Sequence, residues 1–185
     1  MSRLFTQRLE DNESMIITGA ERFSDYSGYA DSFQFTGNHN DMTLRDGSGR
    51  RNTSIVAMDA LHFSRREDQY SRPKVDRELR KAFAGFQNRH VADGRGLVAV
   101  ATGNWGCGAF GGDPRLKALL QLMVAGEVKR DVAYFTFGDD KLRQDVFDLY
   151  TFLVENNVTV GRIYQVIFNF TIHKGWPKKK VTFFW

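Results

Sequence analysis

Glycines are unusually dense between Gly103 and Gly112, the segment of this chain with the clearest potential for chemistry. Five glycines fall in this stretch, and they are interleaved with Trp105 and Phe110, which are apolar and costly to expose. Glycine loses more conformational entropy on folding than any other residue, so such a cluster needs a reason. We favour close approach of a ligand to bare backbone over a plain connecting loop.

The sequence on either side of the glycines predicts a phosphate site. The apolar run Leu97–Ala101 is typical of a strand buried on both faces. Asp113 is a good helix N-cap and Pro114 then occupies the first helical position, so a helix should begin there. Unpaired N–H groups in a loop, backed by a helix N-terminus, attract anions. We therefore expect a phosphate-bearing nucleotide at the carboxyl end of this strand.

The same glycines leave a second interpretation open. Gly106, Gly108 and Gly111 satisfy G-x-G-x-x-G, the fingerprint of a Rossmann-type dinucleotide-binding protein. That fingerprint requires an acid about 20 residues further on, at the end of the next strand. Asp131 is near that distance, but it precedes the expected strand 132–137. The Rossmann-type protein is therefore the alternative.

The rest of the chain supplies elements that would position this loop. Strands are expected at 14–18, 32–35, 54–58, 97–101 and 131–137, and helices at 3–12, 68–86, 115–127, 141–155 and 160–170. Strands alternate with helices from Ser54 onward, which predicts an α/β layered fold with a largely parallel sheet. The length of 185 residues, without a repeat or a linker, is that of one domain.

Composition favours a nuclear or cytoplasmic protein. The single cysteine, Cys107, excludes an intramolecular disulfide and indicates a reducing compartment. The apolar runs are too short to cross a bilayer, and the N-terminus lacks the apolar core of a signal peptide. The net charge is only +4, and we interpret Arg50–Arg51 and Lys178–Lys180 as solvated surface. Neither membrane association nor direct DNA binding is expected.

Other candidates for chemistry are weak. No His, Cys or Asp cluster has metal-ligand spacing, so neither a metal nor a cofactor is expected. Cys107 has no evident base and is interpreted as a loop contact rather than a nucleophile. The acids Glu10, Asp11 and Glu13 are interpreted as solvated surface.

Residues 101–118, Ala-Thr-Gly-Asn-Trp-Gly-Cys-Gly-Ala-Phe-Gly-Gly-Asp-Pro-Arg-Leu-Lys-Ala, closely resemble the diphosphate loop of eukaryotic poly(ADP-ribose) glycohydrolases. Residues 16–29, 55–63 and 132–139 resemble further segments of that family. The resemblance covers residues 1–170 as a partial domain, and it leaves 171–185 as an unmatched tail that we expect to be disordered. It implies a macrodomain-like, three-layer α/β/α fold with a mixed, largely parallel sheet, incomplete at its N-terminal side.

The resemblance also implies a ligand and its contacts. The implied ligand is ADP-ribose at the end of a poly(ADP-ribose) chain, attached to poly(ADP-ribosyl)ated proteins, and the implied reaction is hydrolysis of ribose–ribose bonds. The implied substrate-binding residues are Tyr29, Asn104, Trp105, Gly106, Cys107, Gly108, Ala109, Phe110 and Phe137. The loop residues would wrap the diphosphate and its ribose, and Phe110 would pack on the distal ribose. Phe137 would stack near the adenine, and Tyr29 would close over the ligand. Without the resemblance, Phe137 would be a core residue and Tyr29 a half-buried aromatic.

The catalytic residues of the family are not found in this sequence. The family signature is a run of three glycines followed by Gln-Glu-Glu, in which one glutamate protonates the leaving ribose oxygen. This sequence contains neither a triple glycine nor a Glu-Glu pair. In the family, the signature lies shortly before the segment with which this chain starts. We therefore expect the C-terminal part of a glycohydrolase domain, inactive by itself. A non-catalytic ADP-ribose-binding module or a truncated isoform is the alternative.

Overall fold

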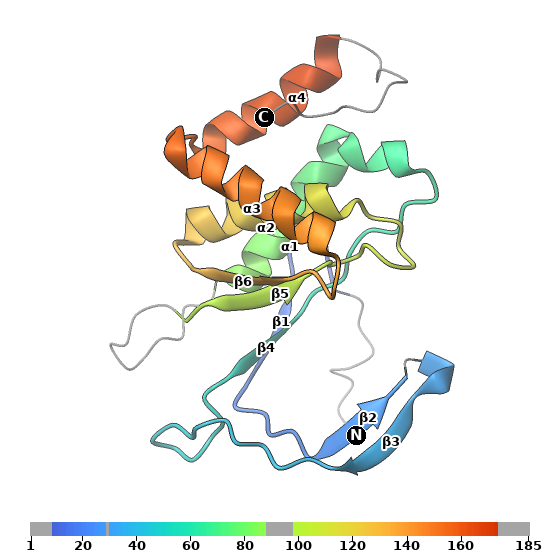
Figure 1. The fold of residues 1–185 in the computed structure, drawn as a ribbon, viewed down its shortest axis with the longest axis vertical. Coiled ribbons are helices and arrows are strands. Elements are labelled where there is room, and N and C mark those ends of the chain that lie inside the picture. The colour runs from blue at the N-terminus through green and yellow to red at the C-terminus, as the bar shows by residue number, and fades with distance from the viewer. Residues whose placement is uncertain (1–8, 29, 88–97, 174–185) are drawn as a thin grey trace. The chain divides into compact units, whose positions relative to one another are not determined.

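The computed structural model describes residues 9–28, 30–87 and 98–173. They divide into two compact units (Figure 1). The smaller unit comprises residues 14–57, and the larger unit comprises the described residues before and after it. Tyr29 and Lys178–Lys180 lie outside the described residues.

The smaller unit contains two antiparallel strand pairs. Strand β1 (Met15–Thr18) pairs with β4 (Ser54–Ala57), and β2 (Ser24–Ser27) pairs with β3 (Gln34–Asn38) after the 3-10 turn η2 (Ala30–Ser32). Strands at 14–18 and 54–58 are confirmed. Their residues Ile17 and Ile55 are 41% and 53% exposed.

Ion pairs fix the polar segment between β3 and β4. Glu21 accepts hydrogen bonds from both Arg45 and Arg51, and Arg50 pairs with Asp46. The Arg51 side chain is only 11% exposed, so the interpretation of Arg50–Arg51 as solvated surface is wrong for Arg51. The Glu21 carboxylate pairs with this guanidinium. The hydrogen bonds from Arg45 and Arg51 lower the pKa of Glu21.

The larger unit is built around a central helix. In chain order its elements are η3 (Arg66–Tyr70), α1 (Arg72–Phe86), β5 (Val100–Gly103), α2 (Pro114–Val128), β6 (Val132–Phe135), α3 (Asp140–Glu155) and α4 (Val160–His173). Figure 1 shows α2 amid the other helices, and it contacts α1, α3, α4 and β6. Its buried residues Leu120, Met123 and Val124 pack on Val75, Ala82 and Phe86 of α1. The core lies between these two helices.

Strands β5 and β6 form a parallel pair, with Val100 opposite Val132 and Gly103 opposite Phe135. The expected strand 97–101 lies in this pair, although β5 begins at Val100, and Leu97 is outside the described residues. The expected burial on both faces is wrong, because Val98 is 61% exposed and Val100 is the one buried residue of the strand. Val100 packs with Ala82 and Phe86 of α1 and with Val124 of α2. Among the described residues, β5 pairs with β6 alone.

The α/β class is confirmed, and the strands form both parallel and antiparallel pairs. The described strands associate two by two, so the sheets are incomplete. Helix α4 continues to His173, and the first three residues of the expected tail are therefore helical. The helix-breaking residues Gly175 and Pro177 come later, and 174–185 lie outside the described residues. At the other end, Asp11 and Asn12 form a turn where a helix was expected.

Among the described helices, none combines the length and the apolar character needed to cross a membrane.

Candidate functional site

The glycine loop lies between a strand and a helix, as the sequence predicts. Strand β5 ends at Gly103 and α2 begins at Pro114. The Asp113 carboxylate accepts hydrogen bonds from the N–H groups of Arg115 and Leu116, each at 2.9 Å, which confirms the N-cap. The N–H of Asp113 itself donates to the side chain of Gln69, a buried residue of η3, at 2.6 Å. Gln69 and the Asp113 cap therefore hold the end of the loop at the start of α2.

Backbone N–H groups of this loop fall into two sets. One set donates within the loop itself, at 2.7 to 3.0 Å: the N–H groups of Trp105, Cys107, Gly111 and Gly112. The other set has no hydrogen-bond partner within the described parts of the chain: the N–H groups of Gly106, Gly108, Ala109 and Phe110. Gly108, Ala109 and Phe110 are exposed, so these N–H groups face solvent and are open to an approaching anion.

Packing of the protein against itself explains most of the glycines. An added Cβ would lie 2.5 to 2.7 Å from another protein atom at Gly103, Gly106, Gly111 and Gly112. Gly106 and Gly111 also adopt positive φ angles of 73° and 70°, which disfavour other residues. Gly108 differs, because a Cβ there would meet nothing within 4 Å. Open approach to the backbone is therefore a reason for Gly108 alone, and not for the whole cluster as the sequence suggested.

A buried ion pair lies against the loop. Lys117, in the first turn of α2, is 1% exposed, and its Nζ lies 2.7 Å from Oε2 of Glu78, which is 2% exposed. The same Nζ lies 4.1 Å from the centroid of the Trp105 ring, whose Nε1–H donates to the carbonyl oxygen of Met58 at 3.2 Å. Burial lowers the pKa of Lys117, and the Glu78 carboxylate opposes that shift.

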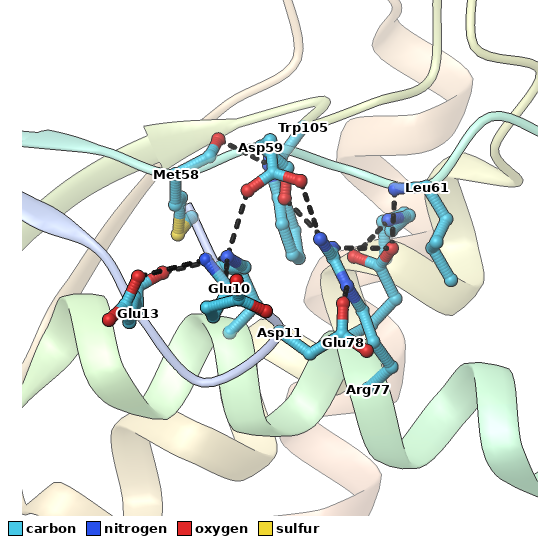
Figure 2. A network of polar contacts seen from close by, with 11 residues as sticks. Glu10, Asp11, Glu13, Met58, Asp59, Leu61, Arg77, Glu78 and Trp105 are labelled. Carbon is cyan, nitrogen blue, oxygen red and sulfur yellow. Dashed lines mark hydrogen bonds and ion pairs between the residues drawn. The ribbon is translucent and has the colours of Figure 1, made fainter. Parts of the chain in front are cut away.

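This pair belongs to a larger network of charges on α1 (Figure 2). Oε1 of Glu78 accepts from the N–H of Leu61 at 2.7 Å. Arg77 pairs with Asp59 and with Asp11, while Lys81 pairs with Asp59. Burial acts against the charge of Asp59, yet the two cations keep its pKa below the ordinary value.

The network reaches the segment before β1. The Lys81 ammonium donates to the carbonyl oxygens of Glu10 and Glu13. The Asp11 side chain is 69% exposed, as expected for solvated surface, but it also binds the buried guanidinium of Arg77. The interpretation of these acids as surface alone is therefore incomplete. Sequence periodicity did not identify the network, because its acids and bases come from separate segments.

Two further side chains hold the start of the loop. Gln121, fully buried in α2, accepts a hydrogen bond from the Thr102 hydroxyl and donates to the Gly103 carbonyl oxygen at 3.0 Å. The Tyr134 hydroxyl of β6 donates to Oδ1 of Asn104 at 3.2 Å, and burial raises the pKa of this tyrosine. The polar residues Lys117 and Gln121 stand four apart in the apolar part of α2, and this spacing was the sequence signal that could have revealed them.

The candidate aromatic residues flank the loop. Phe110 is 44% exposed and lies edge-on to His62, with ring centroids 5.8 Å apart. Phe137 follows β6 and is 82% exposed, so its interpretation as a core residue is wrong. The Cε2 atom of Phe137 lies 2.7 Å from the position of an added Cβ on Gly103, so the ring lies beside the start of the loop. Phe137 also adopts a φ of 55°, a strained conformation for an aromatic residue.

Cys107 is partly buried in the loop, and burial raises its pKa to about 11. The thiol is therefore protonated at neutral pH, which agrees with its interpretation as a loop contact. In the described part of the chain, no group of three or more His, Cys, Asp or Glu could hold a metal ion. The site thus offers unpaired N–H groups, a helix N-terminus and exposed aromatic rings, which together suit an anionic ligand with a planar ring.

Comparison with known proteins gives concordant matches. Residues 1–144 match the family model of poly(ADP-ribose) glycohydrolase with a macro domain fold. Poly(ADP-ribose) glycohydrolase 1 of Arabidopsis thaliana is 31% identical, over 98% of this chain and 44% of the relative. Poly(ADP-ribose) glycohydrolase 2 of Caenorhabditis elegans is 35% identical, over 85% of this chain and 34% of the relative. The chain therefore spans less than half the length of these relatives.

Proposed function

Since the chain belongs to the poly(ADP-ribose) glycohydrolase family, whose fold is the macro domain, we propose that its glycine loop binds the diphosphate of ADP-ribose at the end of a poly(ADP-ribose) chain. The observation that carries this proposal is the set of unpaired N–H groups around Gly108, where the backbone is open to approach. The bound ADP-ribose unit is part of poly(ADP-ribose), the polymer whose ribose–ribose bonds the enzymes of this family hydrolyse.

The loop binds the diphosphate through its backbone. The N–H groups of Gly106, Gly108 and Ala109 donate to the phosphate oxygens, and hydrogen bonds to charged acceptors are stronger than neutral ones. The N-terminus of α2, which begins just after the loop, adds a favourable dipole. Lys117 does not take part directly, because its ammonium is buried against Glu78.

Aromatic side chains complete the proposed site. Phe137 presents an exposed ring beside the start of the loop, and that ring is suited to stack near the adenine. Phe110, at the far end of the loop, packs against the distal ribose. A strained, exposed aromatic has no evident benefit for stability, and such residues cluster at ligand sites.

The residues of this sequence bind and orient, but they do not supply the acid. Hydrolysis of a glycosidic bond needs a carboxyl group that protonates the leaving oxygen. The Gln-Glu-Glu signature is absent from the 185 residues, and Glu78, near the loop, is buried and already paired with Lys117. We infer that the chain by itself binds the nucleotide with little turnover.

The Rossmann-type alternative is less favoured. Strand pairing places Val100 opposite Val132, so Asp131 stands at the start of β6 and the glycine loop follows the other end of β5. An acid that contacts a ribose in that fold would have to stand at the carboxyl end of β6, the strand that follows the loop.

The proposal is tested by calorimetric titration of ADP-ribose into the full chain and a Gly108→Val variant. A Cβ added at Gly108 has no protein atom within 4 Å beyond its chain neighbours, so the variant should keep its fold. We expect its affinity to fall by at least about tenfold, the equivalent of one hydrogen bond to a charged group. Gly161→Val is the matched control, because Gly161 in α4 also has no atom within 4 Å of an added Cβ. Absence of binding by the parent, or equal affinity in Gly108→Val, would overturn the proposal.

A further inference from the structure

We propose that Lys117 is a positioning residue: paired with Glu78 and stacked on Trp105, its ammonium holds the glycine loop in the conformation that presents its unpaired N–H groups. The expected consequence is tighter binding of ADP-ribose, and this part of the inference rests on the proposed function. Its structural part, the conformation of the loop, can be measured without any ligand.

Lys117 fills the space beneath the loop at two points. Its Nζ and Cε lie 3.4 and 3.7 Å from the position of an added Cβ on Gly106. Its Cε lies 3.2 Å from the corresponding position on Gly112, whose N–H donates to the Gly106 carbonyl oxygen at 3.0 Å. The lysine side chain therefore supports both ends of the hydrogen bond that closes the loop.

The charge of Lys117 orients the residue before Gly106. Its Nζ lies 4.1 Å from the Trp105 ring centroid, within the range of a cation–π interaction. The ring N–H of Trp105 donates to Met58, so the indole is held by the ring face and the ring edge together. The first unpaired N–H of the loop belongs to the peptide bond between Trp105 and Gly106. Holding Trp105 in place therefore fixes the direction in which this N–H points.

Glu78 connects this support to the other side of the loop. One carboxylate oxygen accepts from the N–H of Leu61 (Figure 2). The other binds Lys117. Two residues beyond Leu61, the N–H of Phe63 donates to the carbonyl oxygen of Phe110 at 2.9 Å. A single buried carboxylate on α1 is thus linked to the start of the loop through Lys117 and to its end through residues 61–63.

A role limited to stability would not require these charges. Replacing both members of a buried ion pair by well-packed hydrophobic residues of similar volume is often neutral for stability or even favourable. The double variant Glu78→Gln/Lys117→Met keeps the approximate shape of both side chains, removes both charges and retains an acceptor oxygen for the N–H of Leu61. We expect it to be far more stable in urea than Glu78→Gln alone, but to bind ADP-ribose at least about tenfold more weakly than the parent, the equivalent of one lost charge-assisted hydrogen bond.

The matched control is Arg115→Met/Asp145→Asn. It removes an ion pair from the same helix, but one whose side chains are 48% and 35% exposed. The control should leave both affinity and loop conformation unchanged. Backbone amide NMR shifts and hydrogen exchange of Gly106, Gly108 and Gly112, recorded without ligand, measure the loop directly. In the double variant these shifts should move and exchange should accelerate, while the amides of α3 stay as in the parent.

Each result decides the matter. Loop amides that match the parent would overturn the inference, and so would a double variant that does not fold, since the pair would then serve the fold as a whole. A parent chain that fails to bind ADP-ribose would contradict the proposed function, while the amide shifts would still show whether Lys117 positions the loop. Parent-like affinity in a double variant whose loop amides have moved would remove the link to binding and overturn the inference.

Discussion

The ammonium of Lys117 lies 2.7 Å from the carboxylate of Glu78, and neither side chain is more than 2% exposed. Removing two charges from water is costly, and their mutual attraction offsets that cost only while both are present. The two residues are 39 positions apart in the sequence, and they connect α1 to the first turn of α2. The stability of the larger unit should therefore depend on keeping the pair together.

Glu78→Gln alone should destabilise the protein strongly. It leaves the Lys117 ammonium buried without a counter-ion, which typically costs about 3–5 kcal/mol of unfolding free energy. Urea unfolding followed by circular dichroism measures the loss. Asp145→Asn, which breaks an exposed pair with Arg115, is the control and should cost less than about 1 kcal/mol. A loss in Glu78→Gln no larger than in this control would show that Lys117 finds another partner.

Removal of the helix cap should have a smaller, local effect. Asp113→Ala deletes the acceptor of two N–H groups at the start of α2 and should cost about 1 kcal/mol of unfolding free energy. Asp113→Asn keeps a capping oxygen and should retain most of the stability. Equal unfolding midpoints for the parent and both variants would mean that Gln69 alone fixes this end of the loop.

The thiol of Cys107 should be slow to react in the folded protein. Burial raises its pKa to about 11 from an ordinary 9.0, so the reactive thiolate is scarce at neutral pH. Alkylation by iodoacetamide should keep accelerating up to about pH 11, whereas in the urea-unfolded chain it should level off near pH 9. The raised pKa also favours folding below pH 9, and this contribution disappears as the pH rises through 11. A folded-state rate that levels off near pH 9 would contradict the shift.

Phe137→Asn should affect stability and binding in opposite directions. Asparagine tolerates the φ of 55° better than phenylalanine, and the ring is 82% exposed, so little burial is lost. We expect unfolding free energy to stay equal or rise by up to about 1 kcal/mol, while affinity for ADP-ribose falls. Phe147→Asn, at an exposed helical position of α3, is the control and should gain no stability and keep its affinity. Unchanged affinity in Phe137→Asn would remove Phe137 from the proposed site.

The 185-residue chain should release ADP-ribose from labelled poly(ADP-ribose) only slowly. General acid catalysis contributes about a hundred- to ten-thousand-fold, and the family signature that supplies the acid is absent from the sequence. The comparison enzyme is poly(ADP-ribose) glycohydrolase 1 of Arabidopsis thaliana, assayed at equal concentration. Comparable rates would show that a carboxylate within these 185 residues acts as the acid.

Local chemistry determined what the sequence predicted well. The Asp113-Pro114 start of α2, the loop before it and the helices between Arg72 and His173 depend on neighbours a few residues away, and all are present. The α/β class follows from the same periodicities, because they are properties of single elements. The motifs around the loop also sufficed to indicate the family.

Only the tertiary structure decided how the loop is supported. Lys117 and Glu78 meet because α1 packs on α2, and no short-range pattern records that contact. Four glycines are explained by atoms of the protein itself, which include Ala60 and Phe63, and this left Gly108 as the open position. The half-exposed β5 departs from its apolar sequence for a related reason, since burial depends on the elements that cover a strand and not on the strand alone.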